Sequence, residues 1–436
     1  MLAASGARAP VPVFTAAGGG AGDALQDLCL RREIRLVDSP RHATVLLVAG
    51  RLPRSLVRPL AQVHDQLPHP RATVWWQAGS PSEPPQLVPG MTTVAAGQDA
   101  AVEAVVTAHR ELLRGVRASE QHVLADEPPA RWRGVGPHGQ GGEGMMGGRP
   151  YGRPMPMTGP DRDGLELDQV RCTVGPFFGP FPPGLALDVV LQGDVVQEAT
   201  AHPNPFAEPD PSPHPAGDAP AHDVFRRALT DAVPVRDLEL ARADHHLRAV
   251  ARVADLHGLR AVARRVVRTA GQLQPGQVAA VRSLRQRLER WRWPRWALAG
   301  VGVLDRQVAS RTVAGPTARA AGVAVDARSD DPVYADLGFE PVTHQEGDAL
   351  ARVRQLLAET EQALELAARA AGRHRAPGSG VEGPRGALTP TSAGSDTALR
   401  LLPDLLAGRE WGDSVTTVVS LDLDLDGAVS PAVAAG

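Results

Sequence analysis

Few side chains in this sequence could carry redox or metal chemistry. Its two cysteines are Cys29 and Cys172, and two isolated thiols cannot supply a four-cysteine cluster or metal site. Because the sequence shows no signal-peptide pattern, we expect both thiols to be free and buried in a reducing cytosol. His245 and His246 lie in a helical pattern without the spacing of a zinc site, so we expect solvated or helix-capping imidazoles. We therefore predict no metal.

Two other stretches allow a ligand-binding interpretation beside a plain structural one. Residues 18–22 are glycine-rich and could cradle a phosphate, but they lack the Lys-Ser/Thr of a P-loop and the GxGxxG spacing. A turn between a strand and a helix is favoured there. Residues 134–148 contain His138, Met145 and Met146, which could hold a metal, although a flexible linker loop is the favoured interpretation.

A Gly/Pro/Phe loop at residues 175–184 precedes a β-hairpin pattern. Proline fixes φ and pushes the preceding residue into extended geometry, so this loop cannot be helical. Apolar residues then alternate through 185–191, Gly193 and Asp194 supply a turn, and Val195 begins a return strand. The sequence therefore predicts a loop that leads into a hairpin.

This loop and hairpin resemble the start of the D subunit of the proton-pumping NADH:quinone oxidoreductase (respiratory complex I) and of the large subunits of nickel–iron hydrogenases. In that family a Gly-Pro-x-His-Pro-x-x-His-Gly loop lines the quinone head-group pocket. Here Gly175 and Pro176 open the loop and Gly184 closes it, but Phe178 and Pro183 stand where the two histidines would be. The resemblance implies a degenerate quinone loop.

A second part of the family's quinone site is also missing. The family continues after the hairpin into a Gly-Tyr-x-His-Arg-Gly stretch, whereas residues 202–206 read His-Pro-Asn-Pro-Phe. The hydrogenases bind nickel through cysteine pairs near both ends of the large subunit, and neither end has such a pair here. The resemblance therefore implies no nickel chemistry.

Residues 10–115 predict an α/β domain, because strand and helix patterns alternate along them. These patterns lie at residues 10–15, 23–32, 44–49, 54–67, 73–76 and 102–113. The stretch 39–50 resembles the B subunit of the same enzyme, which holds the terminal iron–sulfur cluster. Pro81 stands in place of a cluster cysteine, so the resemblance implies the fold of that subunit without its cluster.

Short motifs of the D-subunit family return, in order, over the C-terminal part of the chain. They are Gly-Pro-x-x-Arg at 315–319, Asp-x-Arg at 326–328, Asp-Pro-x-Tyr at 331–334, Gly-Asp-x-x-x-Arg at 347–352 and Val-Glu-x-Pro-Arg-Gly at 381–386. Each motif alone is weak, but their order is specific. The resemblance implies that the residues that fold this half are kept.

Residues 281–296 are basic and aromatic, with six arginines and three of the seven tryptophans. Three interpretations compete: nucleic-acid binding, contact with a membrane surface or a membrane protein, and an amphipathic helix. The net charge of −3 argues against nucleic acid. An amphipathic helix with a solvated Arg face and Trp packed inward is favoured.

Length and composition fit a globular protein of two or three domains, since 436 residues are 43% hydrophobic. No run approaches 18 apolar residues, so we expect no membrane span. We predict domains at 10–115 and 161–436, with a Gly/Pro/Met-rich linker at 116–160. The expected fold class is an α/β domain with a flavodoxin-like parallel sheet, followed by an α+β, mainly helical domain with β-hairpins that resembles the hydrogenase large subunit.

These resemblances imply a B-like half joined to a D-like half, both without the residues that carry electrons or quinone. We expect a cofactor-free structural subunit of a complex I-like or group 4 hydrogenase-related membrane assembly. It would lie in the cytoplasm, peripheral on the inner face of the plasma membrane. Its expected partners are membrane subunits of a complex I-like or antiporter-like assembly, and no nucleic acid.

Two alternatives stay open, and with them the question of whether the chain is an enzyme. The D-like pocket could bind quinone through Phe177, Phe178 and Phe181, with a cluster supplied by an iron–sulfur partner subunit. A reduced quinone also needs proton donors, and none is evident in the loop. The other alternative is a soluble regulator without a membrane partner.

Overall fold

The structure is a computed structural model. It describes residues 9–78, 87, 88, 91–95, 97–125, 157–161, 163–207, 223–290, 292–378, 380–389 and 396–425. The predicted positions of Pro81, His138, Met145 and Met146 lie outside these ranges.

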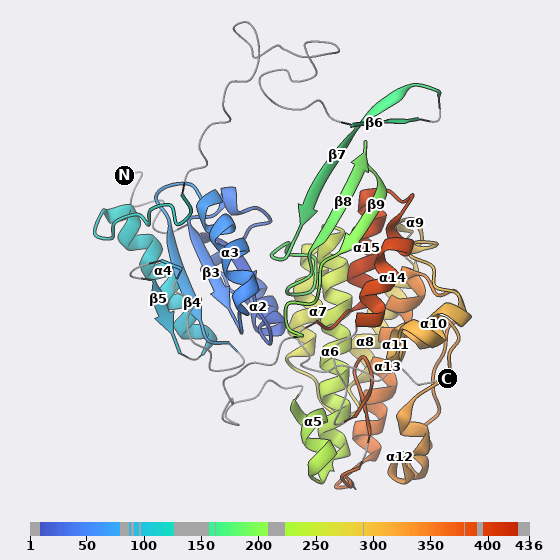
Figure 1. The fold of residues 1–436 in the computed structure, drawn as a ribbon. Helices are drawn as coiled ribbons and strands as arrows, with labels where there is room; N and C mark the ends of the chain where they lie inside the picture. Colours follow the sequence, from blue (N-terminus) through green and yellow to red (C-terminus); the bar gives the residue numbers. More distant parts are fainter. Residues whose placement is uncertain are drawn as a thin grey trace, which may run out of the picture.

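Five parallel strands form the sheet of the N-terminal part, in the order β2-β1-β3-β4-β5 (Figure 1). The strands are β1 (Val11–Ala17), β2 (Ile34–Leu36), β3 (Val45–Ala49), β4 (Ala72–Trp76) and β5 (Thr92–Val94). An order of 2-1-3-4-5 is that of flavodoxin-like sheets. The predicted parallel sheet is confirmed, whereas β2 and β5 were not predicted, since runs of three residues show little periodicity.

Helices cover both faces of this sheet, which explains the continuous apolar run of β3. The helices are α2 (Gly22–Asp27), α3 (Arg54–Gln66) and α4 (Gln98–Arg114). Leu46 and Val48 share one core with α3, and Val45 and Leu47 share the other with α4. A strand buried on both sides has no polar face, as in other doubly wound sheets.

The residues after α4 return along the sheet before the chain leaves it. Glu120 is buried and accepts hydrogen bonds from the backbone N–H of Thr73 (2.8 Å) and from its hydroxyl (2.7 Å). Asp65 accepts bonds from the backbone N–H groups of Val123 and Leu124. The interval predicted as a linker therefore begins with residues that pack on the α/β part.

A four-stranded antiparallel sheet follows, in the order β6-β7-β8-β9. Its strands are β6 (Met157–Pro160), β7 (Glu166–Val174), β8 (Leu187–Gln192) and β9 (Val195–Ala201). The predicted hairpin is the pair β8–β9, and β6 and β7 form a further antiparallel pair ahead of it. β7 extends away from the core, and Cys172 on it is exposed while Cys29 is half-buried. Both thiols are free, but the expectation that both are buried was wrong.

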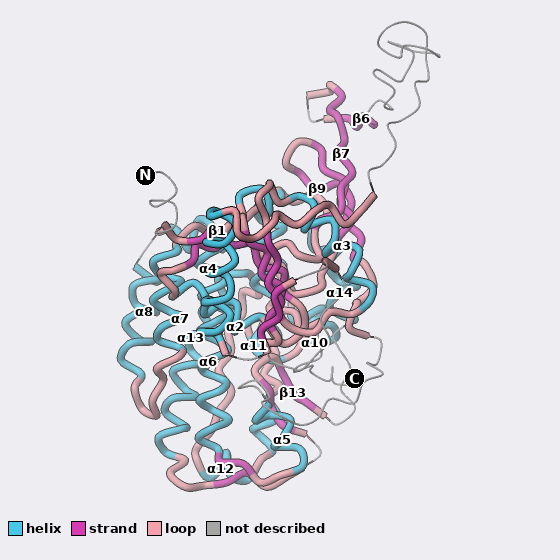
Figure 2. Tube along the Cα trace, turned by 90° about the vertical axis from the view of Figure 1, so that its left-hand side faces the viewer, coloured by secondary structure: helices cyan, strands magenta, loops and turns pink. Residues whose placement is uncertain are grey.

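The C-terminal part is mainly helical, and α6 packs along α13 at its centre (Figures 1 and 2). The helices are α5 (Asp223–Thr230), α6 (Val235–Leu256), α7 (Arg260–Ala270), α8 (Val278–Arg290), α9 (Trp293–Leu298), α10 (Arg306–Thr312), α11 (Gly315–Arg319), α12 (Pro332–Asp336), α13 (Ala349–Arg369), α14 (Asp396–Leu406) and α15 (Trp411–Leu421). Two short ribbons accompany them, β10–β11 (Val233–Pro234 with His374–Arg375) and β12–β13 (Val381–Gly383 with Gly386–Leu388).

The apolar residues of 235–268 recur at helical spacing in the sequence, but a glycine divides this pattern. The pattern over 235–268 is two helices, because α6 ends at Leu256 and Gly258 adopts a φ of +74° before α7 begins. A left-handed φ is available to glycine at little cost and ends a helix readily.

The two halves contact each other through α2 and α6. Arg248 on α6 bonds Asp27 at 2.7 Å, and the amide of Gln26 donates to the carbonyl of Arg248 at 3.0 Å. Arg51 lies over the ring of Phe206, 5.1 Å from its centroid. The apolar core on the α3 face continues into the helical part, so the halves share buried surface. In the described part of the chain, no helix is long and apolar enough to cross a membrane.

Candidate functional site

The predicted quinone loop, residues 175–184, packs into the core. Phe177 and Phe181 are buried and Phe178 is half-buried. The rings of Phe178 and Phe181 meet edge to face with centroids 5.0 Å apart, and both lie beside Trp411 at the start of α15. Aromatic packing of this kind stabilises a loop. The phenylalanines therefore have a structural role that needs no ligand.

The glycines at the two ends of the loop are required by the backbone. Gly175 has a φ of +98°, and a Cβ there would lie 2.0 Å from the carbonyl oxygen of Leu185. Gly184 has a φ of +84°, and its Cβ would lie 2.5 Å from the ring of Phe206. Pro176 and Pro183 are half-buried between them. The family motif is thus retained where it shapes the loop.

We expect Gly175→Ala to destabilise the protein by about 2 kcal/mol or more, since it combines a left-handed φ with a clash against backbone. Chemical denaturation measures the change. Gly179→Ala is the matched control, because Gly179 lies in the same loop and a Cβ there would meet nothing within 4 Å. Equal stability of the two variants would contradict this account of the loop.

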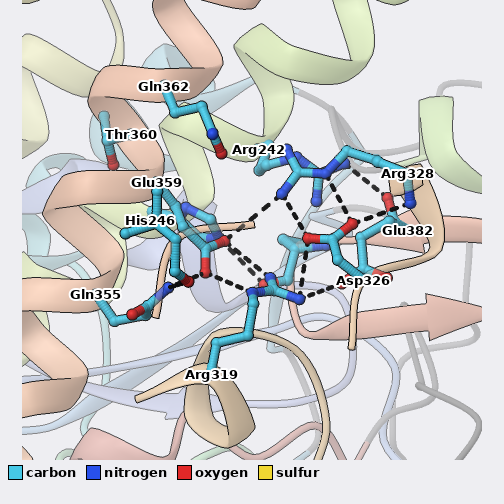
Figure 3. Close-up of polar contacts among 12 residues, drawn as sticks. Arg242, His246, Arg319, Asp326, Arg328, Gln355, Glu359, Thr360, Gln362 and Glu382 are labelled. Atoms are coloured by element: carbon cyan, nitrogen blue, oxygen red, sulfur yellow. Dashed lines mark hydrogen bonds and ion pairs between the residues drawn. The ribbon is translucent and has the colours of Figure 1, made fainter. Parts of the chain in front are cut away.

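Charged residues of three C-terminal motifs meet residues of α6 and α13 in one buried network, which we call the charge cluster (Figure 3). It consists of Glu239, Arg242, Arg319, Asp326, Arg328, Glu359 and Glu382, all 4% exposed or less. Arg319 is its centre. The guanidinium donates to both carboxylate oxygens of Glu359, at 2.7 and 2.9 Å, and to Glu382 at 2.9 Å. Such a fork-shaped pair is strong and fixes geometry.

The rest of the charge cluster links α6 to the later motifs. Arg328 pairs with Asp326 at 2.8 Å and with Glu239 at 3.2 Å. The hydroxyl of Tyr334 donates to Glu239 at 2.6 Å. Arg242 donates to the backbone carbonyls of Glu382 and Gly383, at 2.8 and 2.7 Å. Five separate segments are therefore held together by one network.

The arginines keep the carboxylates of Glu359 and Asp326 charged although both are buried. Burial alone would raise the pKa of Glu359, but Arg319 lowers it to about 2. Asp326 has its pKa held far below its usual range by Arg328 and Arg319, against the effect of burial. Burial and the neighbouring Asp326 raise the pKa of Glu382. Glu359 and Asp326 are therefore fixed as ion pairs, which suits a structural role.

The two adjacent histidines are buried, so the expectation of solvated or capping imidazoles was wrong. His246 donates from Nε2 to the carbonyl of Pro384 at 3.1 Å, its Nδ1 has no partner, and burial lowers its pKa to about 4. His245 lies 2.6 Å from Asp422. α6 is covered on several sides, and therefore even its polar residues face neighbours.

Asp422 is the centre of a second polar cluster at the end of α15. Its carboxylate meets Arg252 at 2.6 Å, Arg385 at 3.2 Å and His245. It also has a φ of +50°, which is uncommon outside glycine. Burial opposes its ionisation, but Arg385, His245 and Arg252 hold its pKa well below the usual range.

A pocket with about 520 Å³ of empty space opens beside Asp422. Its polar wall comprises Thr317, Arg352, Arg385, Ser420, Asp422 and Asp424. Burial lowers the pKa of Arg352 to about 10, and its guanidinium donates to the hydroxyl of Ser420. This lining can bind a polar head group through hydrogen bonds and charge. Sequence reasoning missed the pocket, because its walls come from five separate segments.

None of the predicted loop residues lines this pocket. The loop contacts Trp411 at the start of α15, whereas Asp422 follows the end of that helix. Eleven helical residues span about 16 Å, so the two features lie at opposite ends of α15. Among the described residues, no three His, Cys, Asp or Glu side chains are placed to hold a metal ion.

The basic and aromatic segment is also arranged differently from the prediction. It divides into α8 and α9, and Trp296 is 73% exposed, so inward packing is wrong for this side chain. The guanidinium of Arg292 lies 4.8 Å from the centroid of its ring. An exposed tryptophan flanked by arginine needs a reason, because large aromatic side chains are usually buried.

Comparison with known proteins confirms the resemblance to the D subunit of complex I. Residues 271–422 match the family described as respiratory-chain NADH dehydrogenase, 49 Kd subunit. A NADH-quinone oxidoreductase D subunit of Streptomyces coelicolor is 47% identical over 73 residues, and one from Chloroherpeton thalassium is 39% identical over 72. These matches cover 16% of this chain and 19% and 16% of the two relatives.

A solved structure of the membrane-bound sulfane sulfur reductase, an archaeal respiratory membrane complex, contains a chain with a partial likeness. It is 20% identical, covers 59% of this chain and 98% of its own length, and has a TM-score of 0.44. On the family and sequence matches, the C-terminal part of the present chain is similar to the complex I D-subunit family. The matched stretch includes Arg319, Glu359 and Glu382 of the charge cluster, and Asp422.

Proposed function

We propose that this chain is a structural subunit of a complex I-like or group 4 hydrogenase-related membrane assembly, and that it holds no cofactor of its own. One observation carries the proposal. The motif residues Arg319, Asp326, Arg328 and Glu382 are engaged in the buried charge cluster. Phe178 and Pro183, in contrast, replace the loop histidines that the family places at quinone. The residues that fold the protein are kept, and those that would react are replaced.

The proposed partners are membrane subunits of a complex I-like or antiporter-like assembly, with the chain peripheral on the inner face of the plasma membrane. The N-terminal parallel sheet supports a B-like half beside the D-like half, since Arg248 and Asp27 join the two within one chain. In this proposal the fused halves keep the packing of two separate proteins.

The pocket beside Asp422 supports a second candidate, a quinone-binding subunit that works with a cluster on an iron–sulfur partner. Arg385 brings N–H donors to this pocket, which the loop lacks, whereas the hydroxyls of Thr317 and Ser420 already donate to the backbone carbonyls of Leu421 and Thr417. Ligand pockets of this type combine an apolar wall with a few polar groups.

A tagged pull-down from gently solubilised membranes of the native host tests both candidates. Mass spectrometry would identify co-purified proteins, and iron content would be measured on the same sample. The structural proposal expects antiporter-like membrane proteins and no iron in the chain purified alone. Iron that arrives with a separate cysteine-rich protein, together with bound quinone, would favour the second candidate. Recovery of the chain alone from the soluble fraction would refute both and leave a soluble regulator.

A further inference from the structure

Residues of α6, α7, α8, α9 and α13 line an apolar pocket. Figure 2 shows where α7 and α8 lie. It has about 580 Å³ of empty space, which includes space open to solvent. Its apolar wall includes Val253, Ala254, Leu288, Leu298, Val353 and Leu357. The proposed function does not use this pocket, and neither the charge cluster nor Asp422 lines it.

Charged side chains at this pocket are mostly arginines. Arg285 is already paired, with Glu361 at 2.7 Å and with Glu289 at 3.1 Å. Arg295 is exposed and forms no ion pair with any described residue. A guanidinium beside an apolar pocket is suited to a ligand with an apolar tail and an anionic head, because arginine matches phosphate oxygens in pairs.

The exposed Trp296 adds an independent observation, since it follows Arg295 on the same short helix. Its indole is 73% exposed and Arg292 lies against it. Tryptophan is enriched where an apolar phase meets water, because its ring is largely apolar and its N–H is polar. The same corner of the molecule therefore offers an apolar pocket wall, a cation without an ion-pair partner among the described residues, and an interfacial aromatic residue.

We infer that this corner binds an anionic membrane phospholipid. One acyl chain enters the pocket between α6, α8, α9 and α13, the phosphate lies against Arg295, and Trp296 sits at the boundary between lipid and water. A neutral lipid or a quinone tail would leave the arginine without a counter-charge. This site is separate from the proposed assembly function, and a lipid-binding measurement on the isolated chain does not depend on partner subunits.

Flotation of the full-length protein with vesicles tests the inference. Vesicles that contain phosphatidylglycerol are compared with vesicles of phosphatidylcholine alone. We expect binding to the anionic vesicles, and Arg295→Glu should weaken it roughly tenfold or more. One cation near an anionic surface contributes strongly to the binding free energy, and reversing its charge doubles the loss. Arg236→Glu is the matched control, since Arg236 is exposed at the start of α6, away from the pocket. Equal losses for both variants would overturn a specific site.

Two further variants test the pocket itself. Ala254→Phe fills it from α6, and Trp296→Ala changes an exposed side chain that the fold does not need. Both are expected to weaken vesicle binding, with Trp296→Ala deciding the result if Ala254→Phe does not fold. Monomeric short-chain phosphatidylglycerol should compete with vesicles, whereas glycerol phosphate should not. Competition by glycerol phosphate, or equal binding to neutral vesicles, would refute the acyl-chain site.

Discussion

Replacing Arg319 with methionine is expected to destabilise the protein by about 3–5 kcal/mol, the usual cost of leaving buried charges without a partner. Glu359, Glu382 and Asp326 all lose their shared cation, and each is almost fully buried. Because a domain is typically stable by only about 5–15 kcal/mol, the variant should be close to unfolding. Chemical denaturation followed by circular dichroism measures the loss.

The control for this prediction is Arg306→Met, which removes an exposed arginine from α10 and should change the stability little. A double variant, Arg319→Met with Glu359→Gln, should recover part of the stability, because it also removes one of the unpaired charges. A loss below about 1 kcal/mol in the single variant would show that the charge cluster is not what holds these segments.

The stability of the protein is expected to fall by about 3 kcal/mol through His246 as the pH drops from about 6.5 to about 4. Burial lowers the pKa of His246 to about 4 in the folded state. An unfolded chain binds a proton at this residue below about pH 6.5, whereas the folded state does not, so acid favours unfolding. His246→Gln should flatten the dependence in this window, measured by urea denaturation.

Acid also destabilises the protein by protonating carboxylates such as Glu359, but in a lower pH range than the one assigned to His246. The pKa of Glu359 is lowered to about 2, so its contribution to the stability of the folded state is present above its ordinary pKa and is lost as the pH falls toward 2.

His42→Gln, at an exposed position, is the control for His246→Gln and should keep the dependence of stability on pH that the parent protein shows. A His246→Gln variant with an unchanged slope would contradict the assignment of this window to His246.

The sequence was sufficient to predict the elements that carry strong patterns. The apolar run that became β3 is buried on both faces, and the alternation in β8 follows from one buried face. The motif order also located Arg319, Asp326 and Glu382 correctly as residues that fold the chain. Their meeting could not be predicted, because Arg319 reaches Glu359 over 40 residues and Glu382 over 63.

Burial of polar residues was the main failure of sequence reasoning. A histidine pair in a helix looks solvated when only its neighbours in sequence are known, but His245 meets Asp422 across 177 residues. The prediction for Trp296 is wrong in the opposite sense: the size of its side chain predicts burial, but the side chain is exposed. In both cases the packing of the helices decides whether a side chain is buried, because it sets which distant residues lie beside that side chain.

The distance along the chain between members of the charge cluster also bears on the time at which the protein folds during synthesis. Arg242 lies 140 residues before Glu382, to whose carbonyl it donates. At about 5–20 residues per second, a ribosome needs on the order of ten seconds to add that length. Throughout this interval Arg242 can pair with Glu239 on the same helix, but the carbonyls of Glu382 and Gly383 to which it donates do not yet exist. The helical half can therefore reach its final packing only late in translation, after the α/β part is complete.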